Sequence, residues 1–166
     1  KEWGNPIGLP YLIPQMLPFC GGGREVVFFF DQDTKATTVK NVRKAIEKTM
    51  EQFGRIDVVL NNAGYYLVGS IEEVSDLEFR QTVDVNLFGM ANVIRQAMPY
   101  LRKQQSGHII NIASIGALSV SPTAAVYCAT KFAVRAISDG LRQENEKLRV
   151  TCIHPGVVES ELANTI

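Results

Sequence analysis

The feature of this 166-residue chain that most constrains its fold is an alternation of short apolar runs with longer amphipathic segments. The apolar runs occupy residues 26–30, 56–60, 108–113 and 149–153, and apolar residues at helical spacing occupy 38–53, 75–102 and 124–147. Strands that are apolar at nearly every position are typical of parallel sheets covered on both faces by helices. The sequence therefore predicts an α/β fold with a doubly wound parallel sheet.

Two local signals predict where helices begin and end. Ser75 and Glu78 have the spacing of a capping box, which favours a helix beginning directly after Ser75. Gly54 follows the amphipathic segment 38–53 and is expected to end that helix, because glycine readily adopts the left-handed conformation found after helix ends.

The first 24 residues differ in character from the rest of the chain. Proline recurs every fourth residue at Pro6, Pro10, Pro14 and Pro18, and three glycines follow at 21–23. Proline disfavours a helix and glycine punctuates loops, so we expect residues 1–24 to form an irregular arm. The predicted organisation is this arm followed by one domain over residues 25–166, in which the N-terminal strand–helix–strand unit is incomplete.

Composition and charge narrow the class of protein. Seventeen basic residues balance seventeen acidic ones, and they are dispersed rather than gathered in a stripe, which argues against nucleic-acid or membrane binding. The apolar stretch 7–19 is broken by prolines, so it fits neither a membrane span nor a secretion signal. A small-molecule substrate is the expected partner.

Cysteine and histidine usage points to a metal-free protein of a reducing compartment. Cys20, Cys128 and Cys152 are too dispersed for a disulfide framework or a zinc site, and the last two lie in apolar segments typical of core positions. His108 and His154 have no partners at ligand spacing. We therefore expect no metal site and a cytoplasmic location.

Polar residues follow the predicted strands at their carboxyl ends. They are Asp31, Asn61 with Asn62, Ser114, and Pro155 with Gly156. Parallel α/β sheets bind ligands in a crevice beyond the carboxyl ends of their strands. The sequence therefore predicts a ligand site at this edge before any relative is considered.

Tyr127 and Lys131 lie four residues apart on a predicted helix and hence on one face of it. A phenol with an ordinary pKa near 10 is a poor proton donor or acceptor at neutral pH. A neighbouring lysine cation stabilises the phenolate, so we expect Lys131 to lower the pKa of Tyr127 for general acid/base work.

These features together, in this order, resemble the short-chain dehydrogenase/reductase family in its single-domain form. The motifs are Asn61-Asn62-Ala63-Gly64, Asn86, Ser114, Tyr127-x-x-x-Lys131 and Pro155-Gly156, and the resemblance extends from about residue 26 to the end of the chain. Each motif alone has an ordinary structural explanation as a strand end, helix cap or turn, whereas their joint order is specific. The resemblance implies a Rossmann-like fold and interconversion of a carbonyl and an alcohol with NAD or NADP.

The resemblance also implies roles for the matching residues. Tyr127 would be the general acid or base, Ser114 would bind the substrate oxygen, and Asn86 would hold a water linking Lys131 to solvent. Lys131 would bind the ribose of the cofactor. The remaining cofactor contacts would come from Asp33, Asn61, Ala63, Gly64, Pro155, Gly156, Val158 and Ser160, in addition to Tyr127 and Lys131. Asp31 is an alternative to Asp33, because the spacing to Asn61 does not decide between them.

The sequence departs from the family pattern at its amino-terminal end. The family has a Thr-Gly-x-x-x-Gly-x-Gly turn that receives the cofactor pyrophosphate, and no such turn is recognisable here. The glycines at 21–23 follow no strand, which favours a linker. Two functions stay open: an NAD(P)-dependent oxidoreductase, or a catalytically silent relative that acts as a binding or scaffold protein.

Two further expectations concern partners and substrate. The resemblance implies a homodimer or homotetramer paired through the helices predicted at 75–102 and 124–147. A hydrophobic mouth for the substrate has several candidate residues, for which core or surface packing is an equal explanation: Tyr65, Tyr66, Leu67, Val120 and Val126.

Overall fold

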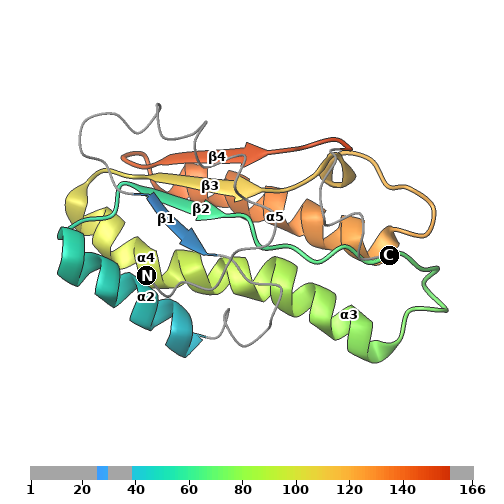
Figure 1. Ribbon diagram of the computed structural model, residues 1–166. Helices are drawn as coiled ribbons and strands as arrows, with labels where there is room; N and C mark the ends of the chain where they lie inside the picture. The colour runs from blue at the N-terminus through green and yellow to red at the C-terminus, as the bar shows by residue number, and fades with distance from the viewer. Residues whose placement is uncertain (1–25, 30–38, 158–166) are drawn as a thin grey trace.

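A computed structural model describes residues 26–29 and 39–157 of the chain (Figure 1). Four parallel strands form one sheet in chain order: β1 (Val26–Phe29), β2 (Val58–Asn61), β3 (His108–Ile112) and β4 (Arg149–Ile153). Helices follow the strands: α2 (Val39–Phe53), α3 (Asp76–Val83), the π-helical segment η2 (Asp84–Gly89), α4 (Met90–Gln104), the short 3-10 helix η3 (Ile115–Ala117) and α5 (Ala125–Glu144). The predicted parallel α/β fold is confirmed.

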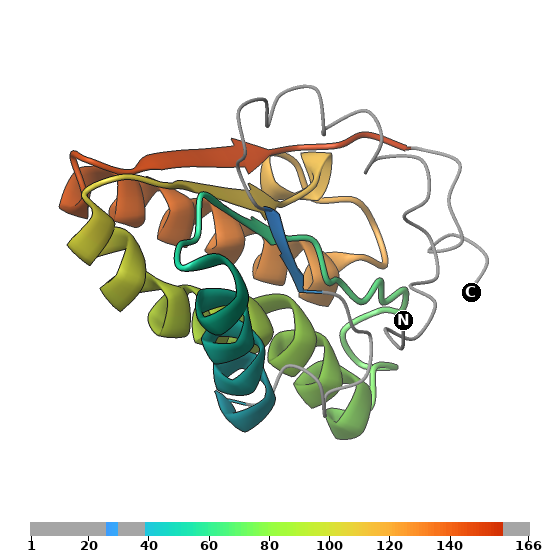
Figure 2. The same ribbon diagram turned by 60° about the vertical axis from the view of Figure 1, so that its left-hand side comes forward.

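The helices α2, α4 and α5 all lie on the same face of the sheet (Figures 1 and 2). This follows from the strand order, because right-handed crossovers that add each strand on the same side place every helix on one face. Among the described residues helices therefore cover one face of the sheet, whereas the sequence predicted helices on both faces. Within that part of the chain, no helix is long and apolar enough to cross a membrane.

The main hydrophobic core lies between the sheet and these three helices. Its fully buried members come from every layer: Val42 and Ile46 from α2, Leu101 from α4, Ile109 from β3 and Val134 from α5. Burial of these side chains fixes the strands against the helices, at about 1.5–3 kcal/mol for each large aliphatic side chain. The core therefore holds the carboxyl ends of β2, β3 and β4 in fixed relation to α5.

Both predicted helix-end signals are confirmed. The Ser75 hydroxyl accepts from the backbone N–H of Glu78, whose carboxylate accepts from the Ser75 N–H in return. Gly54 has φ of +74° and donates its N–H to the Met50 carbonyl, ending α2.

Strand β2 begins two residues later than predicted, at Val58. The reason is that a side chain already binds the backbone of Ile56. Gln104 of α4 accepts the Ile56 N–H at 3.0 Å and donates to its carbonyl at 2.7 Å.

Helix α5 ends at Glu144 rather than near residue 147. Asn145 supplies the stop, because its side-chain N–H₂ donates to the Leu141 carbonyl at 2.9 Å and its side-chain oxygen accepts from Arg102 at 3.0 Å. The predicted middle helix is interrupted by η2, which contains Asn86.

Several predictions lie outside the described residues. They are the irregular arm at 1–24 and the cofactor contacts assigned to Asp31 or Asp33, Val158 and Ser160.

Candidate functional site

The residues that follow β2, β3 and β4 meet at one edge of the sheet, as predicted. The strands are joined beyond their ends, since the Ala113 N–H donates to the Ile153 carbonyl at 2.8 Å and the Ile115 N–H donates to the Pro155 carbonyl at 2.9 Å. Ser114 lies between these two bonds and Asn61 ends the neighbouring strand. The geometry places the serine directly beside the Pro155-Gly156 segment.

Tyr127 and Lys131 share the face of α5 that packs toward this edge. Tyr127 is 9% exposed and Lys131 is 4% exposed. The Lys131 Nζ lies 5.7 Å from the centroid of the Tyr127 ring. The predicted pairing of phenol and ammonium on one helix face is therefore present, and both groups are withdrawn from water.

Lys131 is held beneath the site by the backbone at the end of β3. Its Nζ donates to the Ile112 carbonyl at 3.1 Å. A Cβ at Gly64 would lie only 3.4 Å from the same Nζ, so a side chain at position 64 would crowd the ammonium. Burial lowers the pKa of Lys131 to about 8, an effect that the neighbouring Cys152 thiol partly opposes.

The pKa of Tyr127 differs in direction from the prediction. Burial raises the pKa of the Tyr127 phenol above its usual value, a side-chain hydrogen bond with Ser114 opposes the rise, and Tyr66 and Cys128 add to it. Lys131 was expected to lower this pKa, but the groups that shift it are Ser114, Tyr66 and Cys128, and burial of the ring has the largest effect. In the ligand-free protein the phenol is therefore held in its protonated form at neutral pH.

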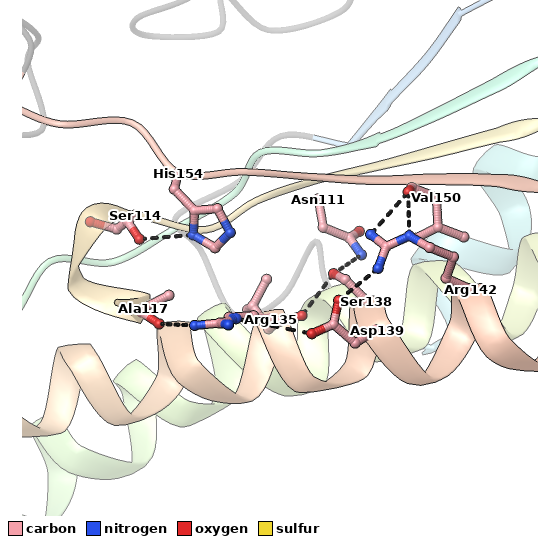
Figure 3. A network of polar contacts seen from close by, with 10 residues as sticks. Asn111, Ser114, Ala117, Arg135, Ser138, Asp139, Arg142, Val150 and His154 are labelled. Atoms are coloured by element: carbon pink, nitrogen blue, oxygen red, sulfur yellow. Dashed lines mark hydrogen bonds and ion pairs between the residues drawn. The ribbon is translucent and has the colours of Figure 1, made fainter. Parts of the chain in front are cut away.

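Ser114 is fixed through both its hydroxyl and its backbone. The Ser114 Oγ accepts from the Gly116 N–H at 3.0 Å, and the Ser114 carbonyl lies 3.1 Å from the Nδ1 of His154. A carbonyl can only accept, so Nδ1 carries the proton of this bond (Figure 3). The following helix η3 is tied to α5 where Arg135 donates to the Ala117 carbonyl at 3.4 Å.

The sequence analysis considered His154 only as a possible metal ligand and did not predict its contact with the Ser114 carbonyl. Its position directly before Pro155-Gly156 is the signal that places it at the site.

Asn86 braces the site through its side chain. Its Nδ2 donates to the Tyr65 carbonyl and to the Thr130 hydroxyl, each at 2.9 Å, and its Oδ1 accepts from the Tyr65 N–H at 2.6 Å. Thr130 in turn donates to the Tyr127 carbonyl at 2.7 Å. These bonds join the loop after β2 to α5, and the predicted water relay through Asn86 stays a prediction.

A second chain of polar side chains runs from β2 to α5. Asn61 donates to Asn111 at 2.8 Å, Asn111 donates to Ser138 at 2.9 Å, and Ser138 donates to the Val134 carbonyl at 2.8 Å (Figure 3 shows the Asn111 end). The Oδ1 of Asn61 is buried and has no partner among the residues that the structure describes. If the side-chain amides of Asn61 and Asn111 were both turned by 180°, the Nδ2 of Asn61 would be the unpartnered atom instead of its Oδ1. In either orientation one atom of the Asn61 amide is left to bind a ligand.

The candidate residues for a hydrophobic mouth do not form one surface. Leu67 and Val126 are buried and Val120 is well exposed, which assigns these three to packing or to the surface. Tyr66 instead packs against Tyr127, with ring centroids 4.8 Å apart. Tyr65 is half-buried, and its backbone carries the two bonds to Asn86 described above.

The arrangement at this edge fits a nicotinamide dinucleotide. The ammonium of Lys131 can donate to ribose hydroxyls, and the absence of a side chain at Gly64 leaves space for it. The unpartnered atom of Asn61 gives a ligand a further hydrogen-bonding group. The fold and site thus define a parallel α/β protein with a serine, a tyrosine and a lysine at the carboxyl edge of its sheet.

Comparison with known proteins identifies the family. The family model of short chain dehydrogenases matches residues 21–166. An uncharacterised oxidoreductase of Staphylococcus saprophyticus is 45% identical over 137 residues, which are 80% of this chain and 56% of that protein. The chain therefore belongs to the short-chain dehydrogenase/reductase family and spans about half the length of the curated relatives it matches.

Solved structures agree with this assignment. ElxO with NADP bound superposes with a TM-score of 0.75 at 30% identity, over 83% of this chain and 55% of that one. A short chain dehydrogenase/reductase from Burkholderia phymatum in complex with NAD superposes with a TM-score of 0.75 at 26% identity, over 80% of this chain and 48% of that one. Members of the family thus carry either cofactor, and the choice stays open for this chain.

Proposed function

We propose that this protein is an NAD(P)-dependent oxidoreductase that interconverts a carbonyl and an alcohol, with Tyr127 as the general acid and base. The observation that carries the proposal is the grouping of three side chains at the ligand edge. The Ser114 side chain lies close enough to the Tyr127 phenol to lower its pKa, and the Lys131 ammonium lies 5.7 Å from the Tyr127 ring.

The protonation states of these groups suit reduction of a carbonyl. The Tyr127 phenol is protonated at neutral pH and would donate this proton to the oxygen of a carbonyl substrate; burial raises its pKa and weakens it as an acid, so the Lys131 cation has to stabilise the phenolate that forms. Ser114 donates a hydrogen bond to the same oxygen and stabilises the negative charge that develops there. In the oxidation direction the phenol must first release its proton to solvent, and the resulting Tyr127 phenolate then accepts the proton of the alcohol.

The chain's own residues would hold the cofactor, which when bound supplies or accepts the hydride. Lys131 would bind its ribose, Asn61, Ala63 and Gly64 would line it, and Pro155 and Gly156 would flank the nicotinamide. The ammonium also favours ionisation of the Tyr127 phenol during turnover, since a cation stabilises a phenolate.

Turnover on a panel of ketones and alcohols tests this function, with NADH, NADPH and their oxidised forms supplied at millimolar concentration. We expect cofactor-dependent conversion of members of the panel, following a pH–rate profile set by a titrating phenol. A folded chain that converts none of them with either cofactor would contradict the proposal.

The second candidate, a silent relative that binds a partner, is favoured by one observation. The sequence contains no Thr-Gly-x-x-x-Gly-x-Gly turn for the pyrophosphate. This candidate predicts weak cofactor binding, with little or no change in melting temperature at millimolar NADH or NADPH. A ligand at one hundred times its dissociation constant would add about 2.7 kcal/mol of stability, so a large shift would exclude this candidate.

We also propose that the protein assembles as a homodimer or homotetramer. Helix α3 and segment η2 expose large apolar side chains, with Leu77 at 74%, Phe79 at 43% and Phe88 at 51% exposure. Arg80 and Asp84 line the same shallow surface pocket as the two phenylalanines, which allows ion pairs across a two-fold axis. Sedimentation at micromolar concentration tests this, and a stable monomer would contradict it.

A further inference from the structure

The loop between β2 and α3 is fastened on both sides of Tyr66. On one side, the N–H and the carbonyl of Tyr65 both bind the side chain of Asn86. On the other side, the Gly69 N–H donates to the Thr123 carbonyl at 2.7 Å. Two such anchors, one to η2 and one to the segment preceding α5, give Tyr66 a defined position in a stretch without regular secondary structure.

The ring of Tyr66 meets the ring of Tyr127 edge to face. The centroids are 4.8 Å apart and the ring planes are inclined at 86°. Tyr66 packs against a small cluster that includes Ala124 and Cys128 as well as Tyr127. This geometry is the favoured arrangement of an aromatic pair, because the positive edge of one ring faces the negative face of the other.

We propose that Tyr66 is a positioning residue for Tyr127, whose ring it holds in place and shields from water. The inference rests on the proposed function, since it concerns the residue that would transfer the proton. It assigns to Tyr66 a role that the motifs of the family do not supply. The anchored loop makes the contact a fixed part of the site.

The contact has a consequence for the titration of the phenol. The groups that face Tyr127 are Tyr66 from the loop, Ser114 from the end of β3, and Cys128 and Lys131 from α5. Burial raises the pKa of Tyr127, with smaller upward effects from Tyr66 and Cys128, while Ser114 lowers it. Removing the ring of Tyr66 admits water and removes one of these upward effects, so the pKa of Tyr127 should fall.

The test is a spectrophotometric titration of phenol ionisation in the ligand-free chain. Subtracting the same titration of Tyr127→Phe, made in each background, isolates Tyr127 from the other four tyrosines. We expect Tyr66→Ala to lower the midpoint of Tyr127 by roughly one pH unit, because a partly buried phenol regains solvent. Tyr66→Phe removes the phenol whose charge contributes to this pKa but keeps the ring that excludes water, so the midpoint should fall by less than it does in Tyr66→Ala.

Two controls keep the test decisive. Tyr65→Phe removes a phenol from the same loop without altering the backbone bonds to Asn86, and it should leave the midpoint unchanged. Tyr66→Leu retains apolar volume and replaces Tyr66→Ala if the alanine variant does not fold. An unchanged Tyr127 midpoint in a folded alanine or leucine variant would overturn the proposal.

This titration needs neither cofactor nor substrate, so it is independent of whether the chain turns over. In an active chain, Tyr66→Ala should lower kcat roughly ten- to hundredfold with a smaller effect on KM, because a displaced phenol is poorly aligned for proton transfer. If the midpoint shifts but Tyr127→Phe retains full activity, the positioning role holds and the proposed function fails.

Discussion

Two clusters of buried polar side chains lie near the same edge of the sheet. The bracing cluster consists of Asn61, Asn111 and Ser138, and the reactive cluster consists of Ser114, Tyr127 and Lys131. The bracing cluster contains only groups that cannot ionise near neutral pH, and they hydrogen-bond to one another. The reactive cluster contains two ionisable groups. Burial raises the pKa of Tyr127 and lowers that of Lys131, so it favours the neutral form of each.

The difference shows what burial costs in each case. A buried amide or hydroxyl can be satisfied by hydrogen bonds alone, and the bonds from Asn61 to Asn111 and from Asn111 to Ser138 do this for every group of the bracing cluster except the Oδ1 of Asn61. A buried ammonium keeps a desolvation cost that one carbonyl does not remove. The buried ammonium of the reactive cluster therefore lowers stability, which is what its proposed role in chemistry predicts.

The largest expected effect is that of Tyr127→Phe on turnover. Phenylalanine retains the ring that packs against Tyr66 and removes only the hydroxyl. General acid/base catalysis is worth about 10²–10⁴-fold, so the rate should fall by at least that order, while the melting temperature changes little. Steady-state rates and thermal unfolding of both proteins measure the two effects, and retention of most of a confirmed wild-type activity would disprove the mechanism.

Lys131→Met should stabilise the protein at neutral pH. The pKa of Lys131 in the folded state, about 8, is below its ordinary value, so the unfolded state binds more protons between these two values. The free energy of unfolding of the wild type should therefore rise as the pH increases from about 8 to the ordinary lysine pKa. Below about pH 8 the wild type should be destabilised by the full cost of the buried charge. Removing the charge should add on the order of 3 kcal/mol at pH 7, less the contribution of the bond to Ile112.

Denaturant unfolding of both proteins across this pH range measures the effect. The gain from Lys131→Met should shrink steadily as the pH rises above about 8. A gain that does not depend on pH would show that methionine acts through packing instead, and the contrast between the clusters would weaken.

Features that depend on local sequence patterns could be predicted, whereas features that depend on long-range side-chain contacts could not. The strands, the capping box at Ser75 and the stop at Gly54 depend on local patterns, and the structure confirms them. The predicted start of β2 and the predicted end of α5 were wrong. Gln104 and Asn145 set them through contacts with residues that are distant in the sequence. Such tertiary side-chain bonds leave no periodic signal in the sequence.

The same distinction holds within the candidate site. The pairing of Tyr127 with Lys131 follows from helical spacing and is present in the structure. The direction of the Tyr127 pKa was wrong, because it depends on how deeply the ring is buried and on Tyr66, which lies on a separate loop. Spacing predicts which groups meet, whereas burial decides how they titrate.

Asn111→Leu tests the bracing cluster. Asn111 is fully buried and exchanges hydrogen bonds with Asn61 and Ser138. Leucine has a similar volume but leaves both partners without their bond, which should cost about 1–3 kcal/mol of unfolding free energy. Chemical denaturation measures this loss, and an unchanged stability would mean that water replaces the lost partner.

Ser138→Ala should have the smallest effect and gives the sharpest comparison, because Ser114→Ala is its matched control. Ser138 accepts from Asn111 and donates to the carbonyl of Val134, so alanine should cost about 1 kcal/mol of stability without altering the site. Ser114→Ala should cost a similar amount of stability, because its hydroxyl accepts from the Gly116 N–H, but it should also slow turnover by roughly a hundredfold, since in the proposed mechanism this serine binds the substrate oxygen. Both variants are compared by melting temperature and by kcat at one pH. If Ser138→Ala slowed turnover as much as Ser114→Ala, the division into bracing and reactive clusters would be wrong, because the amide chain would then position the catalytic groups as well as the sheet edge.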